Sequence, residues 1–267
     1  MTGVVARDYA VRAVVRAARL LELLRASEGG APLNELAASS GLAKASVFRM
    51  LRTLEGLGFV ERPDGSDTYR LGVRCLELGQ AYLEQTDLRR EALPVLERLR
   101  DRFDETVHLG VLDDEYRVVY LEKLDSTQAV GIMMSRVGKT APSHCTGLGK
   151  ALLAARDGDP VGALVERGAL RRYTPNTIHR PAELRRELTR ITRRGYALDL
   201  EEHEPGVRCV ACAIDGPSGS AVAALSIAGP AQRVAEESLR GELAAAAREA
   251  AREIGLRLGA DRREAAS

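Results

Sequence analysis

Residues 32–71 read PLNELAASSGLAKASVFRMLRTLEGLGFVERPDGSDTYRL, and this stretch decides the fold of the first part of the chain. It predicts a short amphipathic helix over 33–39, a tight turn over 40–42 and a second helix over 43–57. Gly41 tolerates the left-handed backbone that a sharp corner between two helices requires. The apolar residues of the second helix recur at i, i+3, i+4 and i+7 and share one face; they are Val47, Met50, Leu51 and Leu54.

A two-stranded hairpin is predicted after the second helix. Gly56 and Gly58 end that helix, and strands over 59–62 and 68–71 flank a turn at Pro63-Asp64-Gly65-Ser66. Helix, tight turn, helix and hairpin together make a winged helix-turn-helix. In such a fold the second helix lies in the major groove of DNA.

The outer face of the second helix carries small, polar and cationic side chains. Small residues allow close approach to DNA, and hydroxyl, guanidinium and ammonium groups reach phosphates or base edges. The candidate DNA-contacting residues are Lys44, Ala45, Ser46, Arg49, Arg52 and Thr53. The alternative is an ordinary solvated face, or a helix-turn-helix that serves protein contacts. We favour DNA because the turn, the face and the hairpin occur together.

The composition is that of a globular protein without a strong overall attraction to nucleic acid. The 267 residues are 45% hydrophobic and 29% charged, with a net charge of +1, which predicts one large or two modest domains. DNA affinity must therefore come from local placement of cations, and it should weaken as salt rises. Nothing resembles a signal peptide or an apolar stretch of about 18 residues, so we expect a cytoplasmic protein that does not bind membranes.

The rest of the chain alternates between helical and strand-like patterns. A helix over 9–26 has a broad apolar side, which serves core packing or contact with a second copy. Further helices are predicted near 87–104, 147–156, 160–167, 181–194 and 231–258, and strands near 106–112, 117–124, 129–135, 196–199, 207–214 and 221–228. We predict an α+β protein: a winged helix-turn-helix over 9–71, a stiff helical connector over 72–87, and an α/β domain with a mainly antiparallel sheet over 88–258.

Several segments resemble those of the IclR family of transcription regulators. They are LAKASVFRMLRTLEGLGFVER (42–62) with YRLG (69–72), and then SRVGKTAPSHCTGLGKALLA (135–154), TPNTI (174–178), RRGYALDLEEHEPGVRCVACAI (193–214) and VAALSIAGP (222–230). The resemblance covers nearly the whole chain, and the order and spacing of the segments are specific. It implies a repressor or activator without a cofactor, a homodimer or homotetramer on a palindromic operator in double-stranded DNA. It also implies a GAF-like sensory domain for small organic acids or aromatic metabolites.

The resemblance also implies an effector pocket in the second domain. The effector's carboxylate is expected against Gly147 and Leu148, where free N–H groups and the dipole of a starting helix attract an anion. Asp199, Cys209 and Ser226 match positions that line the pocket, and Val130, Met133 and Ala141 match positions in its wall. Ala228 stands where the family often has a second Ser, so one hydrogen bond is lost and the smallest, most polar ketoacids are disfavoured. The small Ala141 and the adaptable Met133 favour an effector larger than a two- or three-carbon acid. The alternative for residues 147–149 is a tight turn without a ligand.

Two other readings compete with an effector pocket. His144-Cys145 and Cys209-x-x-Cys212 are residue types that bind zinc, although two residues three apart in one strand point to opposite faces. Alternatively, Cys209 or Cys145 is a nucleophile with His144 as its base, with nearby carboxylates for acid–base work. The sequence shows no recognisable arrangement of a nucleophile, a base and a group that orients the base. We therefore predict no metal site and a regulator rather than an enzyme.

Overall fold

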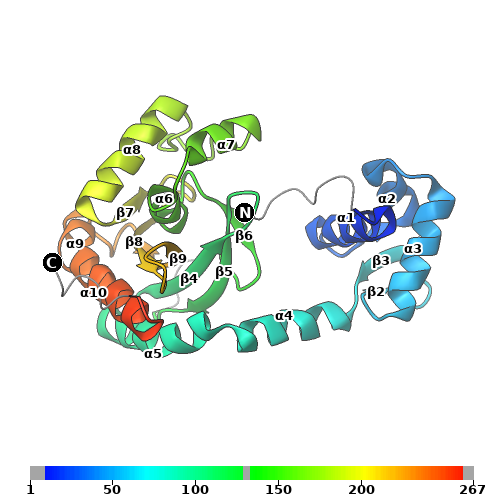
Figure 1. Cartoon of the computed structure of the whole chain (residues 1–267), viewed down its shortest axis with the longest axis horizontal. Helices are drawn as coiled ribbons and strands as arrows, with labels where there is room; N and C mark the ends of the chain where they lie inside the picture. Colours follow the sequence, from blue (N-terminus) through cyan, green and yellow to red (C-terminus); the bar gives the residue numbers. More distant parts are fainter. Residues whose placement is uncertain (1–9, 129–132, 261–267) are drawn as a thin grey trace. The chain divides into compact units, whose positions relative to one another are not determined.

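The computed structural model describes residues 10–128 and 133–260, and the chain divides into two compact units between Gln85 and Thr86 (Figure 1). This boundary lies within the segment expected to connect two domains. In the part of the chain that the structure describes, no helix is both long and apolar enough to span a membrane.

The first unit is a three-helix cluster with a small antiparallel sheet and a trailing helix. Its elements are α1 (Arg12–Ala26), β1 (Ala31–Pro32), α2 (Leu33–Ser40), α3 (Lys44–Gly56), β2 (Val60–Glu61), β3 (Thr68–Leu71) and α4 (Val73–Gln85), and the strand order is β1-β3-β2. Leu20, Leu36, Val47 and Leu51 are fully buried and pack the three helices together. Gly41 ends α2 at φ 68°, which provides the predicted corner between α2 and α3.

The winged helix-turn-helix is therefore confirmed, with small differences at its edges. β1 was not predicted, because a two-residue strand has no periodicity to detect. It pairs with β3 through Ala31 opposite Tyr69 and Pro32 opposite Thr68. Among the described residues α1 begins at Arg12, later than the predicted start.

The second unit is a six-stranded antiparallel sheet covered by helices on both faces. Its strands are β4 (Thr106–Leu112), β5 (Arg117–Leu124), β6 (Thr140–Pro142), β7 (Ala197–Leu200), β8 (Val207–Asp215) and β9 (Ala221–Pro230), in the order β6-β5-β4-β9-β8-β7. Its helices are α5 (Asp87–Phe103), α6 (Gly147–Ala154), α7 (Pro160–Glu166), α8 (Pro181–Arg194), α9 (Glu236–Arg240) and α10 (Glu242–Arg257).

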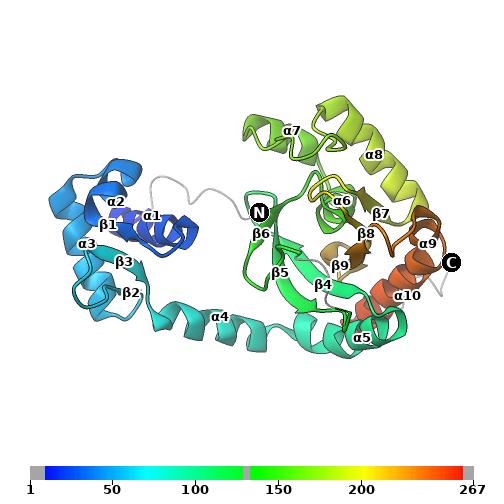
Figure 2. The same cartoon turned by 180° about the vertical axis from the view of Figure 1, so that it is seen from behind.

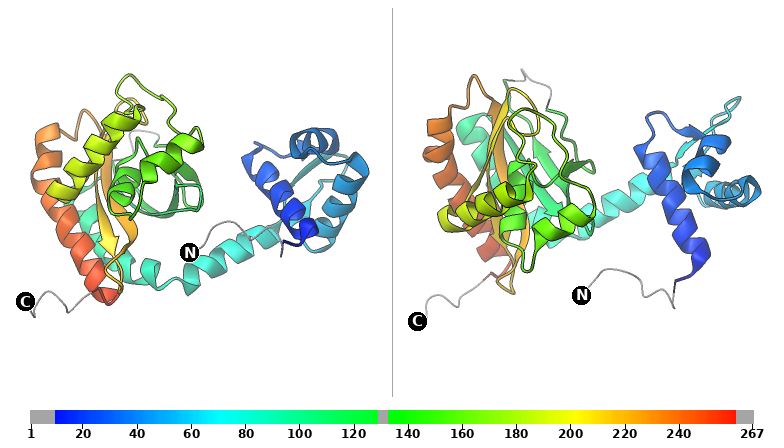
Figure 3. Two further views of the ribbon diagram at one scale, coloured as in Figure 1. Left: turned by 45° about the horizontal axis from the view of Figure 1, so that its top comes forward. Right: turned by 90° about the horizontal axis from the view of Figure 1, so that it is seen from above.

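The helices form two layers around this sheet. α5 and α10 pack together on one face, and α6 packs on the other, with α8 against α6 and α7 against α8 (Figure 2). Two further directions in Figure 3 show the same layers. Leu148, Leu152, Leu164 and Leu184 are buried where α6, α7 and α8 meet. The predicted α+β class with a mainly antiparallel sheet is confirmed.

Three predictions for the second unit need correction or lie outside the description. The strand expected over 129–135 falls partly on residues 129–132, which are not described, and residues 133–135 form no strand. β6 was not predicted, because only its pairing with β5 identifies it. The single helix expected over 231–258 is two helices, since Gly241, at φ −100° and ψ −105°, takes a non-helical backbone between them.

Candidate functional site

The outer surface of α3 consists of the residues predicted to contact DNA. Lys44, Ala45, Arg49, Arg52 and Thr53 are exposed, and Ser46 is partly exposed. The opposite face of the helix is buried in the core of the unit, through Val47, Leu51 and Leu54. One face therefore fixes α3 in place, while the other presents cations and small side chains to solvent.

The cations on α3 differ in how they are engaged. A guanidinium nitrogen of Arg52 lies 2.6 Å from a carboxylate oxygen of Glu55, which partly neutralises it. In the described part of the chain Lys44 and Arg49 make no ion pair, so their charges are available to phosphate or base edges. Thr53 donates a hydrogen bond to the carbonyl of Arg49 (2.9 Å) and is engaged with its own helix.

Phe48 is a member of this surface that the sequence analysis did not select. Its side chain is 44% exposed although it is large and apolar. It lies on α3 between Ala45 and Arg52, three and four residues away, which places the three on one face. An exposed ring at this place is suited to contact with a thymine methyl group.

Six of the predicted effector-binding residues surround one cavity in the second unit. They are Met133, Gly147, Leu148, Asp199, Cys209 and Ser226, and the cavity has a volume of about 40 Å³. This volume holds roughly three water molecules. Val130 lies outside the described residues. The other lining residues are His108, Tyr120, Ser135, Thr146, His203, Glu204, Val207 and Ala228.

Ala141 does not lie in the wall of this cavity, contrary to the prediction. It is in β6, opposite Val118 of β5, and belongs to the core cluster that also holds Leu164 of α7. It lines a different cavity on the α7 side of the unit. The family resemblance assigned it to the pocket wall together with Met133, but the pairing of β6 with β5 directs it elsewhere.

The start of α6 lines the first cavity with Gly147 and Leu148, and the amide of Gly147 lies within hydrogen-bonding reach of the sulfur of Cys209. Thr146 caps the helix, because its hydroxyl accepts a hydrogen bond from the amide of Gly149 (3.3 Å). The amide of Lys150 bonds to the carbonyl of Thr146 (2.9 Å), so Gly147 and Leu148 precede the first intrahelical donor. Their N–H groups and the helix dipole attract negative charge to this end of the cavity.

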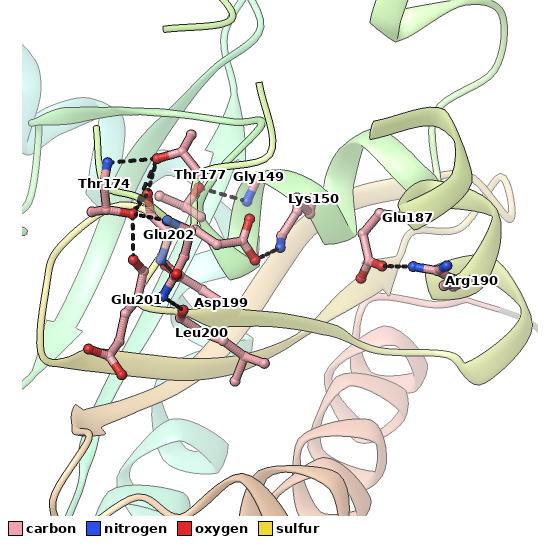
Figure 4. Close-up of polar contacts among 12 residues, drawn as sticks. Gly149, Lys150, Thr174, Thr177, Glu187, Arg190, Asp199, Leu200, Glu201 and Glu202 are labelled. Atoms are coloured by element: carbon pink, nitrogen blue, oxygen red, sulfur yellow. Dashed lines mark hydrogen bonds and ion pairs between the residues drawn. The ribbon is translucent and has the colours of Figure 1, made fainter. Parts of the chain in front are cut away.

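Asp199 stands opposite the helix start with its carboxyl group buried. Burial raises its pKa to about 7, against the opposing effect of the nearby Lys150 ammonium. Its carboxylate accepts a hydrogen bond from the amide of Glu202 (2.7 Å). Lys150 forms a buried ion pair with Glu202, shown in Figure 4. The carboxyl group of Asp199 therefore changes charge close to neutral pH.

His108 was not predicted, although it lines the cavity and contacts two other lining residues. Its Nδ1 lies 3.3 Å from the hydroxyl of Ser226 and its Nε2 lies 2.8 Å from that of Ser135. Burial lowers its pKa to about 3, so the ring is neutral, with one donor and one acceptor nitrogen. His108 and Ser226 are opposite each other on β4 and β9, a pairing that no local pattern reveals.

The zinc reading fits the structure poorly. Among the described residues, no three His, Cys, Asp or Glu side chains are grouped so that they could hold a metal ion. Cys209 lines the cavity beside α6. The thiol of Cys212 lies on the other face of the sheet, where the charge of Arg248 on α10 acts on its pKa.

The nucleophile reading meets a similar difficulty. Burial raises the pKa of Cys145 and of Cys209 well above the usual value, so both are thiols rather than thiolates at neutral pH. His144 uses its Nε2 on the carbonyl of Arg171 (2.8 Å). The geometry favours a binding pocket over a catalytic centre.

Comparisons with known proteins agree with this division into a DNA-reading unit and a ligand-binding unit. The IclR helix-turn-helix domain matches residues 13–64, and the bacterial transcriptional regulator IclR C-terminal domain matches residues 80–256. The acetate operon repressor of Salmonella typhimurium is 33% identical over 253 residues, covering 94% of this chain and 92% of that protein.

Solved structures show the same similarity. An IclR transcriptional regulator from Silicibacter has a TM-score of 0.82 at 28% identity, covering 93% of this chain and 97% of that one. An IclR homologue from Microbacterium hydrocarbonoxydans, solved in complex with 4-hydroxybenzoate, has a TM-score of 0.74 at 28% identity, covering 93% and 100%. With both of its units matched in order, the chain belongs to the IclR family of DNA-binding transcriptional regulators.

Proposed function

We propose that this protein is a repressor whose affinity for a palindromic operator is changed by a small organic or aromatic carboxylate bound in the second unit. The observation that carries the proposal is the cavity at the start of α6, where the first residues of the helix and several buried polar side chains line one space. The winged helix-turn-helix over 9–71 binds the operator, and residues 88–258 bind the effector. The segment over 72–87 connects these two domains. The protein acts in the cytoplasm, where a bacterial operator lies.

The DNA-reading role is assigned to the outer surface of α3. Lys44, Arg49 and Arg52 bind phosphates or base edges, while Ala45, Ser46 and Thr53 allow the helix to approach the groove closely. Lys44 and Arg49 are the strongest candidates because they are exposed and make no ion pair within the described residues.

The effector role is assigned to the residues around the first cavity. The carboxylate of the effector accepts hydrogen bonds from the amides of Gly147 and Leu148, and the hydroxyl of Ser226 orients its other end. Asp199 and Cys209 are the polar groups between these two ends, and a few oriented polar groups are what a small-molecule site requires. Binding of a carboxylate beside Asp199 favours the protonated form of that residue.

The size of the cavity constrains the effector. At about 40 Å³ it accepts a short acid as it stands, which counts against the larger effector that Ala141 and Met133 suggested. An aromatic acid, such as the one in the Microbacterium homologue, requires the wall to move. Met133 is the wall residue best able to do so, since its unbranched side chain adapts its shape.

The regulator is proposed to act as a dimer or tetramer. On the first unit Val14 and Val15 of α1 and Leu76 of α4 are more than half exposed, although they are apolar. In α1, Leu20 and Leu24 are buried in the core of the unit and Ala17, Leu21 and Leu23 pack against it, so Val14 and Val15 lie outside it. A second copy that covers these side chains would pair two α3 helices for the two half-sites of a palindrome. The effector then acts by its differential affinity for two arrangements of this assembly.

The test separates the two units. Genomic fragments selected on immobilised protein supply the operator, and fluorescence anisotropy measures its affinity. Arg49→Ala should weaken operator binding by about tenfold or more, since a good base or phosphate contact contributes roughly 1–3 kcal/mol. Arg193→Ala, an exposed arginine on α8, is the matched control and should leave binding unchanged.

The effector is sought by a thermal-shift screen of organic and aromatic acids on the full chain. An acid that binds should release wild-type protein from the operator. Ser226→Ala should lower the affinity of the protein for the acid without changing its affinity for the operator. Loss of both activities in one folded variant would contradict this division of labour. Turnover of the acid without DNA would favour an enzyme instead.

A further inference from the structure

A second cavity lies in the same unit, on the side of the sheet covered by α7. Its volume is about 290 Å³. It is lined by residues 115–117 and 140–144 together with Leu164, Ala169, Arg171 and Tyr173, and none of these residues lines the first cavity. The second cavity is therefore larger than the proposed effector pocket and separate from it.

Two buried polar atoms among the residues lining this cavity lack a partner. Within the described residues, the hydroxyl of Ser143 and Nδ1 of His144 make no hydrogen bond, although both side chains are almost completely buried. Buried polar atoms in native proteins nearly always have a partner. The pair therefore indicates that an occupant supplies the missing hydrogen bonds.

The chemistry of the missing partner follows from the tautomer of His144. Its Nε2 lies 2.8 Å from the carbonyl oxygen of Arg171, and because a carbonyl only accepts, Nε2 carries the proton. Burial lowers the pKa of His144, so the ring is neutral and Nδ1 has a free lone pair. The occupant must present a hydrogen-bond donor to this atom, such as a hydroxyl group.

Cations are in excess among the residues that line the cavity and those that contact them. Arg171 is exposed and, in the part of the chain that is described, makes no ion pair; its guanidinium lies 5.8 Å from the ring centroid of Tyr173. Arg156 and Arg167 lie 4.9 and 5.3 Å from the ring centroid of Tyr116. Arg117 also lines the cavity, and its charge is balanced by carboxylates of its own turn. This environment favours an anion.

The body of the cavity is apolar and flanked by aromatic rings. Ala141, Pro142, Leu164 and Ala169 line it together with the ring of Tyr173. An apolar body lined by a cation without an ion pair and by a buried acceptor matches a flat ring that carries an acid and a hydroxyl group.

We propose that this cavity is a second ligand site, which takes a hydroxylated aromatic acid. The carboxylate pairs with Arg171, the ring packs against Tyr173 and Leu164, and the hydroxyl donates to Nδ1 of His144. Such a ligand contacts the loop that leads to Gly147 three residues later. The Tyr173 ring also lies 6.0 Å from His144 and 5.3 Å from His203, a residue of the first cavity. The second site does not depend on which acid the first cavity binds.

The experiment is isothermal titration of the full chain with 4-hydroxybenzoate, with benzoate as the matched acid that lacks the hydroxyl. Ser226→Leu fills the first cavity and should leave a saturable 4-hydroxybenzoate site. Ala169→Phe, which fills the second cavity, should abolish that site in the Ser226→Leu background. Arg171→Gln should weaken binding there by about tenfold, because it removes a charge-assisted hydrogen bond.

The hydroxyl contact has its own readout. Benzoate should bind the Ser226→Leu protein roughly tenfold more weakly than 4-hydroxybenzoate, and His144→Phe should remove that difference. Circular dichroism confirms that each variant is folded, and Arg171→Gln, an exposed change, serves if Ala169→Phe does not fold. Absence of 4-hydroxybenzoate binding in Ser226→Leu overturns the proposal, as does binding that neither Ala169→Phe nor Arg171→Gln affects. Neither outcome bears on operator release by an effector of the first cavity.

Discussion

The ammonium of Lys150 and the carboxylate of Glu202 form an ion pair from which solvent is almost excluded, with side chains 1% and 8% exposed (Figure 4). Lys150 lies in the first turn of α6, and Glu202 lies in the loop that follows β7. The pair therefore ties the helix start that we propose to bind the effector to the segment that holds Asp199. Thr174 and Thr177 hold the same loop from the other side, through the carbonyls of Glu201 and Glu202.

Removal of one partner of this pair should be costly. Lys150→Met leaves the Glu202 carboxylate buried without its cation, and we expect the free energy of unfolding to fall by about 3–5 kcal/mol. Lys150→Met combined with Glu202→Gln should recover part of this loss, since no buried charge is left alone. Urea unfolding at pH 7 measures both. Equal stabilities of the single and double variants would show that the pair is not desolvated in solution.

Binding of a carboxylate effector should tighten as pH falls from 8 to 6. Burial raises the pKa of Asp199 to about 7, so the carboxyl group is mostly an anion at pH 8 and mostly a neutral acid at pH 6. The neutral carboxyl group of Asp199 does not repel the carboxylate of the effector. Binding of the effector above the pKa therefore leads Asp199 to take up a proton. Lys150, Glu202 and Glu204 lie near this group, and the pKa values of both glutamates are also raised by burial. Titration in two buffers with different ionisation enthalpies detects the proton.

Asp199→Asn is the control for this pH dependence. It keeps an oxygen that accepts the bond from the Glu202 amide but cannot ionise. Its effector affinity should be nearly independent of pH between 6 and 8, where the wild-type affinity changes by up to about tenfold per pH unit above the pKa. A wild-type profile as flat as that of the variant would rule Asp199 out as the titrating group.

The same carboxyl group should lower the stability of the protein as pH rises. Asp199 binds a proton more tightly in the folded state than in the unfolded state, since its folded pKa of about 7 lies above 3.8. Its contribution is fully present below pH 3.8 and is lost as pH rises to 7. Asp199→Asn should therefore gain stability relative to wild type between pH 5 and pH 8, measured by urea unfolding. Comparing the two proteins cancels the opposite effect of His108, which they share.

Gly147→Ala should abolish the effector response while operator binding is kept. A Cβ added at Gly147 would lie 2.5 Å from Sγ of Cys209, which is too close for two non-bonded atoms, so the start of α6 must shift. Cys209→Ala in the same protein removes the sulfur and should restore part of the response. Operator anisotropy with and without effector measures both variants. A full response in Gly147→Ala would mean that the effector does not use this helix start.

Two substitutions on α3 should separate charge from shape in operator binding. Lys44→Ala removes a phosphate contact, so the slope of log affinity against log salt should fall by about 1. Phe48→Ala removes apolar contact only. It should lower the affinity for the operator by about fivefold without changing that slope. Phe48 is 44% exposed, so its loss should leave the melting temperature nearly unchanged. Identical salt slopes for wild type and Lys44→Ala would remove Lys44 from the interface.

The local periodicity of apolar residues was sufficient to predict most of the secondary structure. The strands predicted over 106–112 and 117–124 and the helix over 181–194 match β4, β5 and α8. The corner at Gly41 and the face of Val47 and Leu51 follow equally from neighbouring residues, because glycine conformation and helical spacing are properties of the chain itself.

Pairing between distant segments decided the rest. Strand register sets His108 opposite Ser226, and the pairing of β6 with β5 moves Ala141 to the second cavity. The raised pKa of Asp199 arises from its burial in the folded unit, and the proton on Nε2 of His144 follows from the position of the Arg171 carbonyl. The sequence by itself determined the order of the elements and the family. Only the tertiary structure decided which side chains share a cavity and with what charge, because burial and contact depend on residues far apart in the chain.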